Sequence, residues 1–113
     1  MPVVIVYGFS KRNKSLSKLI ETIDYLMCDP GTELNFKEDE ISIFVPVDLI
    51  TKKSGENITI VVEGTSDSTR IEWSVDLLAM NVAPMVRDYF PEAKNVEFFV
   101  KISGRQVHLS LPR

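Results

Sequence analysis

The residue with the clearest chemical potential in this sequence is the proline at position 2. The opening stretch, "MPVVIVYGFS", places Pro2 directly before a run of strand-forming residues. Proline is tolerated there because the first residue of a strand often has no ladder partner. A second interpretation is chemical. If Met1 is removed after synthesis, the chain begins with a secondary amine at the end of a strand, and such an amine can act as a base.

An N-terminal proline suits the enolisation of a carbonyl compound. That reaction needs a group that removes a carbon-bound proton, with a pKa near the working pH. A terminal α-amino group titrates at about 7.7 to 8.0, and apolar surroundings lower its pKa because they disfavour the charged form. With Met1 removed, Pro2 beside Val3 and Val4 and facing apolar strands would be such a base. Cationic side chains nearby would stabilise the enolate and a substrate carboxylate.

The first half of the chain predicts a strand, a helix and a second strand. Residues 3–7 are continuously apolar, as in a strand covered on both faces. Apolar side chains recur every three or four residues over 16–27 and predict a helix, which Asp29-Pro30-Gly31 ends. Alternation over residues 41–47 predicts the second strand, and Pro46 places its end near a sheet edge or a bulge.

The second half repeats this order. Residues 58–62 form a β-branched run, and helical spacing follows from Ile71 to Tyr89, with Pro84 expected to kink the helix. Thr69 and Glu72 resemble a capping box at the start of that helix. Residues 95–103 predict a fourth strand, and the turn at 103–106 leads into a short fifth strand, 107–111, which could pair with a neighbouring subunit.

The repeated order predicts an α+β fold of two layers with a duplicated β-α-β unit and a mixed sheet. Offsets of 56 and 55 residues align Gly8 with Gly64 and Phe44 with Phe99. The repeat units span about 2–48 and 58–102, within a single domain covering residues 1–113. Gly8 and Gly64 are interpreted as strand-to-helix turns, because neither lies in a phosphate-binding motif.

Composition narrows the functional classes. A length of 113 residues suits one domain with its own core, and a net charge of -3 argues against nucleic-acid and anionic-membrane binding. The only cysteine, Cys28, cannot form an internal disulfide, which favours a reducing compartment. No apolar run approaches the roughly 20 residues of a membrane helix, and no leader precedes the first strand. We therefore expect a cytoplasmic protein.

A repeated β-α-β unit of this length, opened by Met-Pro and a β-branched strand, resembles the tautomerase superfamily. This group contains 4-oxalocrotonate tautomerase and macrophage migration inhibitory factor. The resemblance covers Pro2 to about Leu111, although its sequence motif is limited to Pro2 and the strand after it. It implies two units related by a pseudo-twofold axis and a homotrimer whose sheets enclose a central core. It also implies a proline base or acid at a subunit boundary, basic residues that bind a substrate carboxylate, and no cofactor.

The resemblance implies candidate substrate-binding residues as well as departures from the family. Lys11 and Arg12 stand near the position where some tautomerases carry a substrate-binding arginine. Asp39 and Glu40 replace a basic residue that some members have at the start of the second strand, and Lys37 is only nearby. Cys28 also stands alone, without the cysteine pair of the migration inhibitory factor branch. The predicted activity is keto-enol tautomerisation of a small α-keto or enol acid, with Pro2 as catalytic base.

Two alternatives remain for the function: a tautomerase-fold binding protein without catalysis, and a ferredoxin-like small-molecule regulatory module with the same element order. The third predicted strand carries no aromatic residue, which argues against an RNA-binding version. His108 lacks metal-site spacing and is interpreted as a surface or interface histidine. Cys28 is expected to be a packed side chain, and Trp73, Leu77 and Met80 are expected in the core or a subunit interface.

Overall fold

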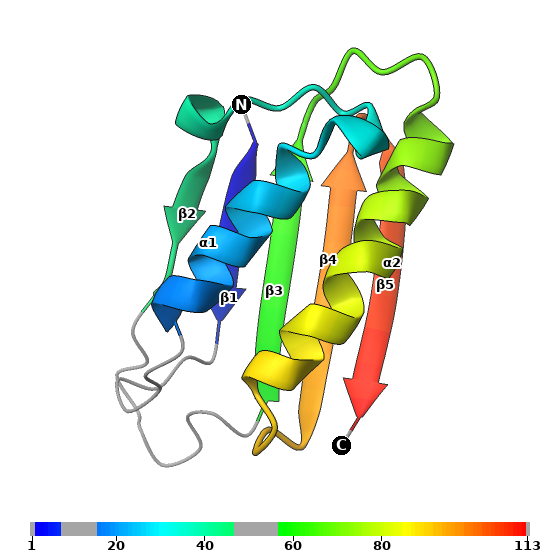
Figure 1. Ribbon diagram of the computed structural model, residues 1–113. Helices are drawn as coiled ribbons and strands as arrows, with labels where there is room; N and C mark the ends of the chain where they lie inside the picture. The colour runs from blue at the N-terminus through cyan, green and yellow to red at the C-terminus, as the bar shows by residue number, and fades with distance from the viewer. Residues whose placement is uncertain (1, 8–15, 47–56, 113) are drawn as a thin grey trace.

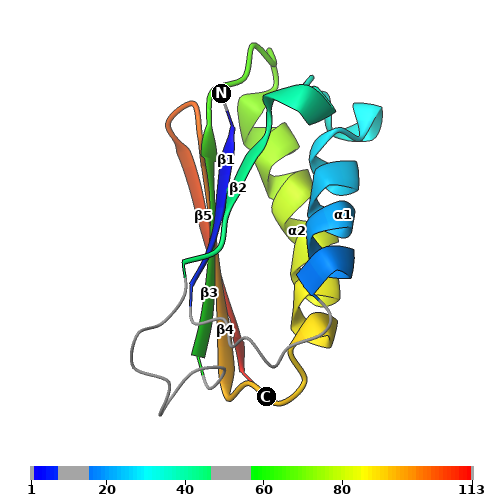
Figure 2. The same cartoon turned by 90° about the vertical axis from the view of Figure 1, so that its left-hand side faces the viewer.

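The fold is a mixed five-stranded sheet with two α-helices packed on one of its faces, as Figures 1 and 2 show. The computed structural model describes residues 2–7, 16–46 and 57–112. Its elements in chain order are β1 (Val3–Tyr7), α1 (Leu16–Met27), η1 (Pro30–Thr32), η2 (Glu38–Glu40), β2 (Ser42–Phe44), β3 (Asn57–Gly64), α2 (Ile71–Tyr89), β4 (Asn95–Ile102) and β5 (Arg105–Pro112).

The strand order is β2-β1-β3-β4-β5. Strand β1 pairs with β2 in parallel and with β3 antiparallel, while β4 pairs with β3 in parallel and with β5 antiparallel. Each helix therefore joins two strands that are direct neighbours. In a ferredoxin-like domain another strand separates the two strands of each unit. The ferredoxin-like alternative is wrong for this sheet, and the predicted two-layer α+β class is confirmed.

Both edge strands differ in length from the prediction. Strand β2 has only three residues in the described part of the chain and pairs with Val3, Val4 and Ile5 of β1. Pro46 follows it at this edge, as predicted. Residues 47 and 48 lie outside the described residues. Strand β5 extends over eight residues and pairs along its whole length with β4 of the same chain. It is an edge strand, so its pairing with a neighbouring subunit stays a prediction.

The predicted capping box of α2 is wrong. The N-cap is Arg70, and its side chain makes no capping hydrogen bond. The backbone before the helix is held instead by serines: the Ser68 hydroxyl accepts from the Arg70 amide at 3.2 Å and meets the Ser74 hydroxyl at 3.0 Å. Pro84 lies inside the helix as predicted. At the other end, the Arg87 guanidinium donates to the carbonyls of Phe90 and Ala93, which fixes the turn that follows the helix.

The core lies between the sheet and the helices, and the predicted apolar stripes face it. Leu19, Ile23 and Met27 of α1 are buried there. On α2 Val75, Leu78 and Val82 are buried, whereas Met85, which has the same helical spacing, is 39% exposed. Trp73 and Met80 are exposed on α2, so the expectation that they lie in the core of this chain is wrong. Their place in a subunit interface stays a prediction. The remaining core residues come mainly from alternate positions of β1, β3 and β4: Val4, Val6, Ile58, Ile60, Val62, Val96, Phe98, Val100 and Ile102.

The opposite face of the sheet carries no helix (Figure 2). We call it the open face; it is formed by the alternate strand residues that point away from the core. Three large apolar side chains are exposed on it: Tyr7 at 45%, Phe44 at 55% and Phe99 at 37%. No helix in the described part of the chain is long and apolar enough to cross a membrane.

Candidate functional site

Pro2 lies at the start of β1, at the end of the molecule where the N-terminus is marked in Figure 1. It is buried, and its carbonyl accepts a hydrogen bond from the Ser42 amide at 3.1 Å. This bond continues the ladder between β1 and β2. Pro2 is thus a strand-start proline, as the structural interpretation predicted. The same position would hold an N-terminal amine in a fixed place, so its catalytic role stays a prediction.

Gly64, the last residue of β3, lies directly against Pro2. A Cβ added to Gly64 would be 3.0 Å from the Pro2 Cα, 3.3 Å from its Cβ and 3.6 Å from its nitrogen. A Cβ contact of 3.0 Å is unusually tight, so Pro2 would have to shift by a few tenths of an ångström. The Gly64 carbonyl also accepts from the Ser103 amide at 3.1 Å. Gly64 was interpreted as a turn; in the structure it provides room for the close approach of Pro2.

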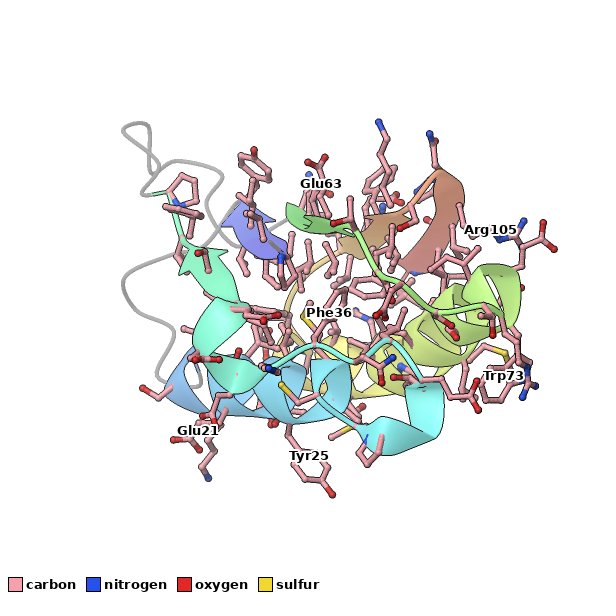
Figure 3. All side chains as sticks on the ribbon, turned by 90° about the horizontal axis from the view of Figure 1, so that it is seen from above. Glu21, Tyr25, Phe36, Glu63, Trp73 and Arg105 are labelled. Carbon is pink, nitrogen blue, oxygen red and sulfur yellow. The ribbon has the colours of Figure 1, made fainter. Side chains whose placement is uncertain are left out.

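Two segments meet at this end of the molecule. The chain between η1 and η2 buries Leu34 and Phe36, and Figure 3 shows Phe36 between the sheet and the helices. The Ser66 hydroxyl, in the loop after β3, donates to the Leu34 carbonyl at 2.7 Å, and the Asn35 amide group donates to Asp67 at 3.2 Å. These bonds tie the loop after β3 to the chain that crosses the end of the core near Pro2.

The structure brings one predicted cation to the Pro2 end. Lys37 is exposed and precedes η2, the turn that leads into Ser42, the hydrogen-bond partner of Pro2. Two acids of the same turn, Asp39 and Glu40, are exposed as well. Lys11 and Arg12 lie outside the described residues. Tyr7, the last described residue before them, is at the opposite end of β1 from Pro2.

Sequence reasoning missed Lys101 as a candidate. It lies on the open face of β4 and pairs in register with Glu63 of β3, which pairs in turn with Val3. A cavity of about 360 Å³ is lined by Lys101 together with Val3, Glu63, Gly64, Thr65, Ser103 and Gly104. Alternation along residues 95–103 could have placed Lys101 on the face opposite the core, but its distance along the chain from Pro2 gave no reason to connect the two.

Another cavity, of about 370 Å³, lies at the C-terminal end of α1 and is rich in acids. Glu21, Asp24, Asp29 and Glu38 line it beside Cys28. Burial raises the pKa of Asp24, and repulsion from Glu38 raises it further; its Oδ1 has no hydrogen-bond partner among the described residues. Burial also raises the pKa of the Cys28 thiol, followed by repulsion from the acids. Cys28 is therefore unsuited to act as a thiolate nucleophile.

His108 is exposed on the open face, as a surface or interface histidine would be. Its Nε2 contacts Glu97 Oε2, and its ring stacks on Phe99 with centroids 4.2 Å apart. The hydrogen bond from His108, followed by that from Asn95, lowers the pKa of Glu97. Among the described residues no group of three or more His, Cys, Asp or Glu side chains could hold a metal ion.

Comparison with known proteins supports the fold rather than a family. No family model matches the sequence, and no curated protein is similar to it. One similar solved structure is a crystal structure of N1, a member of the cis-3-chloroacrylic acid dehalogenase family. It is 13% identical, with a TM-score of 0.64, and the match covers 88% of this chain and 73% of that one. That family belongs to the tautomerase superfamily, so the fold of this protein is tautomerase-like.

Proposed function

We propose that this protein interconverts the keto and enol forms of a small α-keto or enol acid, with Pro2 as the proton-transferring base. The observation that carries the proposal is the placement of Pro2 at the start of β1, an interior strand of a tautomerase-like sheet, between Ser42 and Gly64. A base held on both sides by backbone is positioned before the substrate arrives, which favours proton transfer.

The proposed chemistry requires that Met1 be removed, so that the Pro2 nitrogen has a basic lone pair. Burial of Pro2 favours the neutral amine, which is the form that accepts a proton. The amine removes the proton from the carbon beside the carbonyl, which leaves an enolate, and the protonated amine then gives that proton to the enolate oxygen to form the enol. Lys37 at the same end is proposed to bind the substrate carboxylate and to offset the enolate charge. Lys11 and Arg12 follow the opposite end of β1, so we propose that they join the site from a neighbouring chain of the trimer.

We also propose that the chain is a single domain made of two repeats, about 2–48 and 58–102, and that it assembles as a homotrimer through the open face. Tyr7, Phe44 and Phe99 expose apolar surface on that face, and such surface is expected to be covered in the assembled protein. Three chains of 12.8 kDa would give a particle of about 38 kDa in light scattering. A mass of one chain at micromolar concentration would contradict the trimer.

Mass spectrometry and turnover together test the catalytic proposal. Intact mass shows whether Met1 is absent, and phenylpyruvate or 2-hydroxymuconate serves as substrate. Reductive methylation would modify lysine side chains as well as the terminal amine. A variant with one glycine added before Pro2 changes the terminal amine alone. That extension turns the amine into an amide and is expected to abolish turnover while the thermal midpoint stays within a few degrees. Equal turnover by the extended chain would overturn the proposal.

A second candidate function is binding without catalysis. It is favoured by the burial of Pro2 and by the hydrogen bonds between Ser66 and Leu34 and between Asn35 and Asp67, which join two segments at that end. Retention of Met1 in the cellular protein would favour this function, because an amide nitrogen has no basic lone pair. Loss of Met1 with turnover that depends on the free amine would exclude it.

A further inference from the structure

Helix α2 carries a second apolar stripe, on the side opposite its buried residues. Four residues at helical spacing form it, and we call them the outer stripe: Trp73, Leu77, Met80 and Pro84. Trp73 is 40% exposed and Met80 is 69% exposed, and Leu77 is half-buried between them. Figure 3 shows Trp73 on the side of α2 that faces away from the sheet. The proposed trimer uses the open face, so it leaves the outer stripe of every chain uncovered.

The arginines beside α2 are all engaged within the chain. The Arg70 guanidinium lies over the Trp73 ring, 4.0 Å from its centroid, and is 3.6 Å from Glu33. The other two arginines bond within the chain as well: Arg87 to the carbonyls of Phe90 and Ala93, and Arg105 to the Asp76 carboxylate. These cations therefore have their charge matched before any partner arrives.

Two carboxylates beside the outer stripe lack such a match. Glu72 precedes Trp73 in the first turn of α2, and Asp88 lies one turn beyond Pro84 in the last. Both are exposed, and neither side chain makes an ion pair or a hydrogen bond with the described residues. The outer stripe is thus apolar surface with uncompensated negative charge at each end.

This charge pattern selects the kind of partner. Apolar surface with acids at its ends is complementary to apolar surface with lysine or arginine at its ends. From Trp73 to Pro84 the stripe is about 17 Å long, or three helical turns, which suits a short helix packed along α2. A second copy of this chain does not fit the pattern, because it would bring the same unmatched carboxylates and no free arginine to pair with them.

We propose that the outer stripe is a docking surface for a basic amphipathic helix of another protein. The apolar side chains of that helix pack on Leu77, Met80 and the exposed part of Trp73, and its cations pair with Glu72 and Asp88. The contact is transient, because one helix face buries less than the roughly 1,200 Å² of a stable interface. Docking uses no residue of the proposed Pro2 site, so it is independent of the proposed reaction.

The test is a fluorescence titration of the full-length protein with a synthetic peptide. The peptide has about 14 residues of lysine, leucine and alanine, with leucine recurring at helical spacing. Trp73 is the only tryptophan in the chain, so its emission reports contact at the outer stripe. A saturable shift to shorter wavelength is expected, with a dissociation constant of about 10–100 μM. The same peptide with glutamate in place of lysine should cause none. Absence of a shift with the lysine peptide would overturn the proposal.

Matched variants test the two parts of the surface. Glu72→Gln with Asp88→Asn should weaken binding about three- to tenfold, the effect of two exposed charge pairs. Asp39→Asn with Glu40→Gln removes the same charges from η2 and should leave affinity unchanged. Met80→Ser removes exposed apolar surface and should weaken binding about tenfold. Equal affinities of the two double variants, or full affinity with Met80→Ser, would contradict the assignment.

Other occupants of the outer stripe would give different results. A second copy would shift the Trp73 emission as the protein alone is concentrated. A lipid surface would shift it when phosphatidylcholine vesicles are added without peptide. Neither shift is expected, because the carboxylates beside the stripe would stay unmatched in both cases. Either shift would assign the stripe to that occupant and overturn the proposal.

Discussion

Gly64 leaves room for Pro2: a Cβ at position 64 would approach the Pro2 Cα to 3.0 Å. Because the backbones of Gly64 and Pro2 are both hydrogen-bonded to neighbouring segments, neither residue can move aside cheaply. Gly64→Ala is expected to reduce the free energy of unfolding by about 1–3 kcal/mol, the usual cost of overpacking. It should also lower any turnover that depends on the Pro2 amine. Urea unfolding and the phenylpyruvate assay measure the two effects.

Gly104→Ala provides the control for Gly64. A Cβ there meets no atom within 4 Å, but the φ angle of 87° makes an alanine strained. This variant should lose stability while its turnover per folded molecule stays unchanged. Equal loss of turnover in the two variants would show that Gly64 has no specific effect on Pro2.

Tyr7 on the open face should matter for assembly. Tyr7→Glu places a charge on the surface proposed to associate, and burying an unpaired charge is costly. The particle mass is therefore expected to fall from about 38 kDa to the 12.8 kDa of one chain. Tyr25, 75% exposed on α1, lies on the helix side, so Tyr25→Glu should keep the full mass. Light scattering of both variants measures the particle mass. An intact trimer with Tyr7→Glu would show that the open face around Tyr7 is not the surface through which the chains associate.

Asp24 should destabilise the protein at neutral pH. Its pKa is raised in the folded chain, so the cost is absent below its ordinary value of 3.8 and grows as the pH rises through the raised pKa. Asp24→Asn is expected to raise the melting temperature by roughly 2–4 °C at neutral pH. The gain should vanish in acid. Glu21→Gln, at the same cavity, is the control, and a gain for Asp24→Asn that persists in acid would contradict the assignment.

The Glu97 carboxylate should stabilise the folded protein, and this contribution should depend on pH in the opposite way to the destabilisation by Asp24. Its pKa is lowered, so its stabilising contribution is complete above the ordinary value of 4.5 and is lost as the pH falls through the lowered pKa. Glu97→Gln removes this charge, so part of the acid sensitivity of the folded protein should disappear. Thermal unfolding at several acidic pH values measures it, with Glu92→Gln on the exposed turn before β4 as the control. Identical acid profiles for Glu97→Gln and the unmodified protein would contradict the prediction.

Local patterns in the sequence determined most of the elements. Apolar residues at helical spacing gave the limits of α1 and α2, and β-branched runs located β1, β3 and β4. These signals are reliable because one side of each element must be buried, and the period of burial follows from backbone geometry. The sequence by itself also singled out Pro2, since a proline before a strand is visible without any fold.

The tertiary structure decided what surrounds that proline. Gly64 lies 62 residues from Pro2 in the chain, and no local pattern states that β1 and β3 align so as to bring them together. In the folded chain β2 spans only Ser42–Phe44, and the Ser68 hydroxyl, rather than a capping box of Thr69, holds the backbone before α2. Lys101 and His108 share a groove because the register of β4 and β5 brings them close. Register between strands depends on the packing of whole faces, so only the folded chain determines which side chains meet.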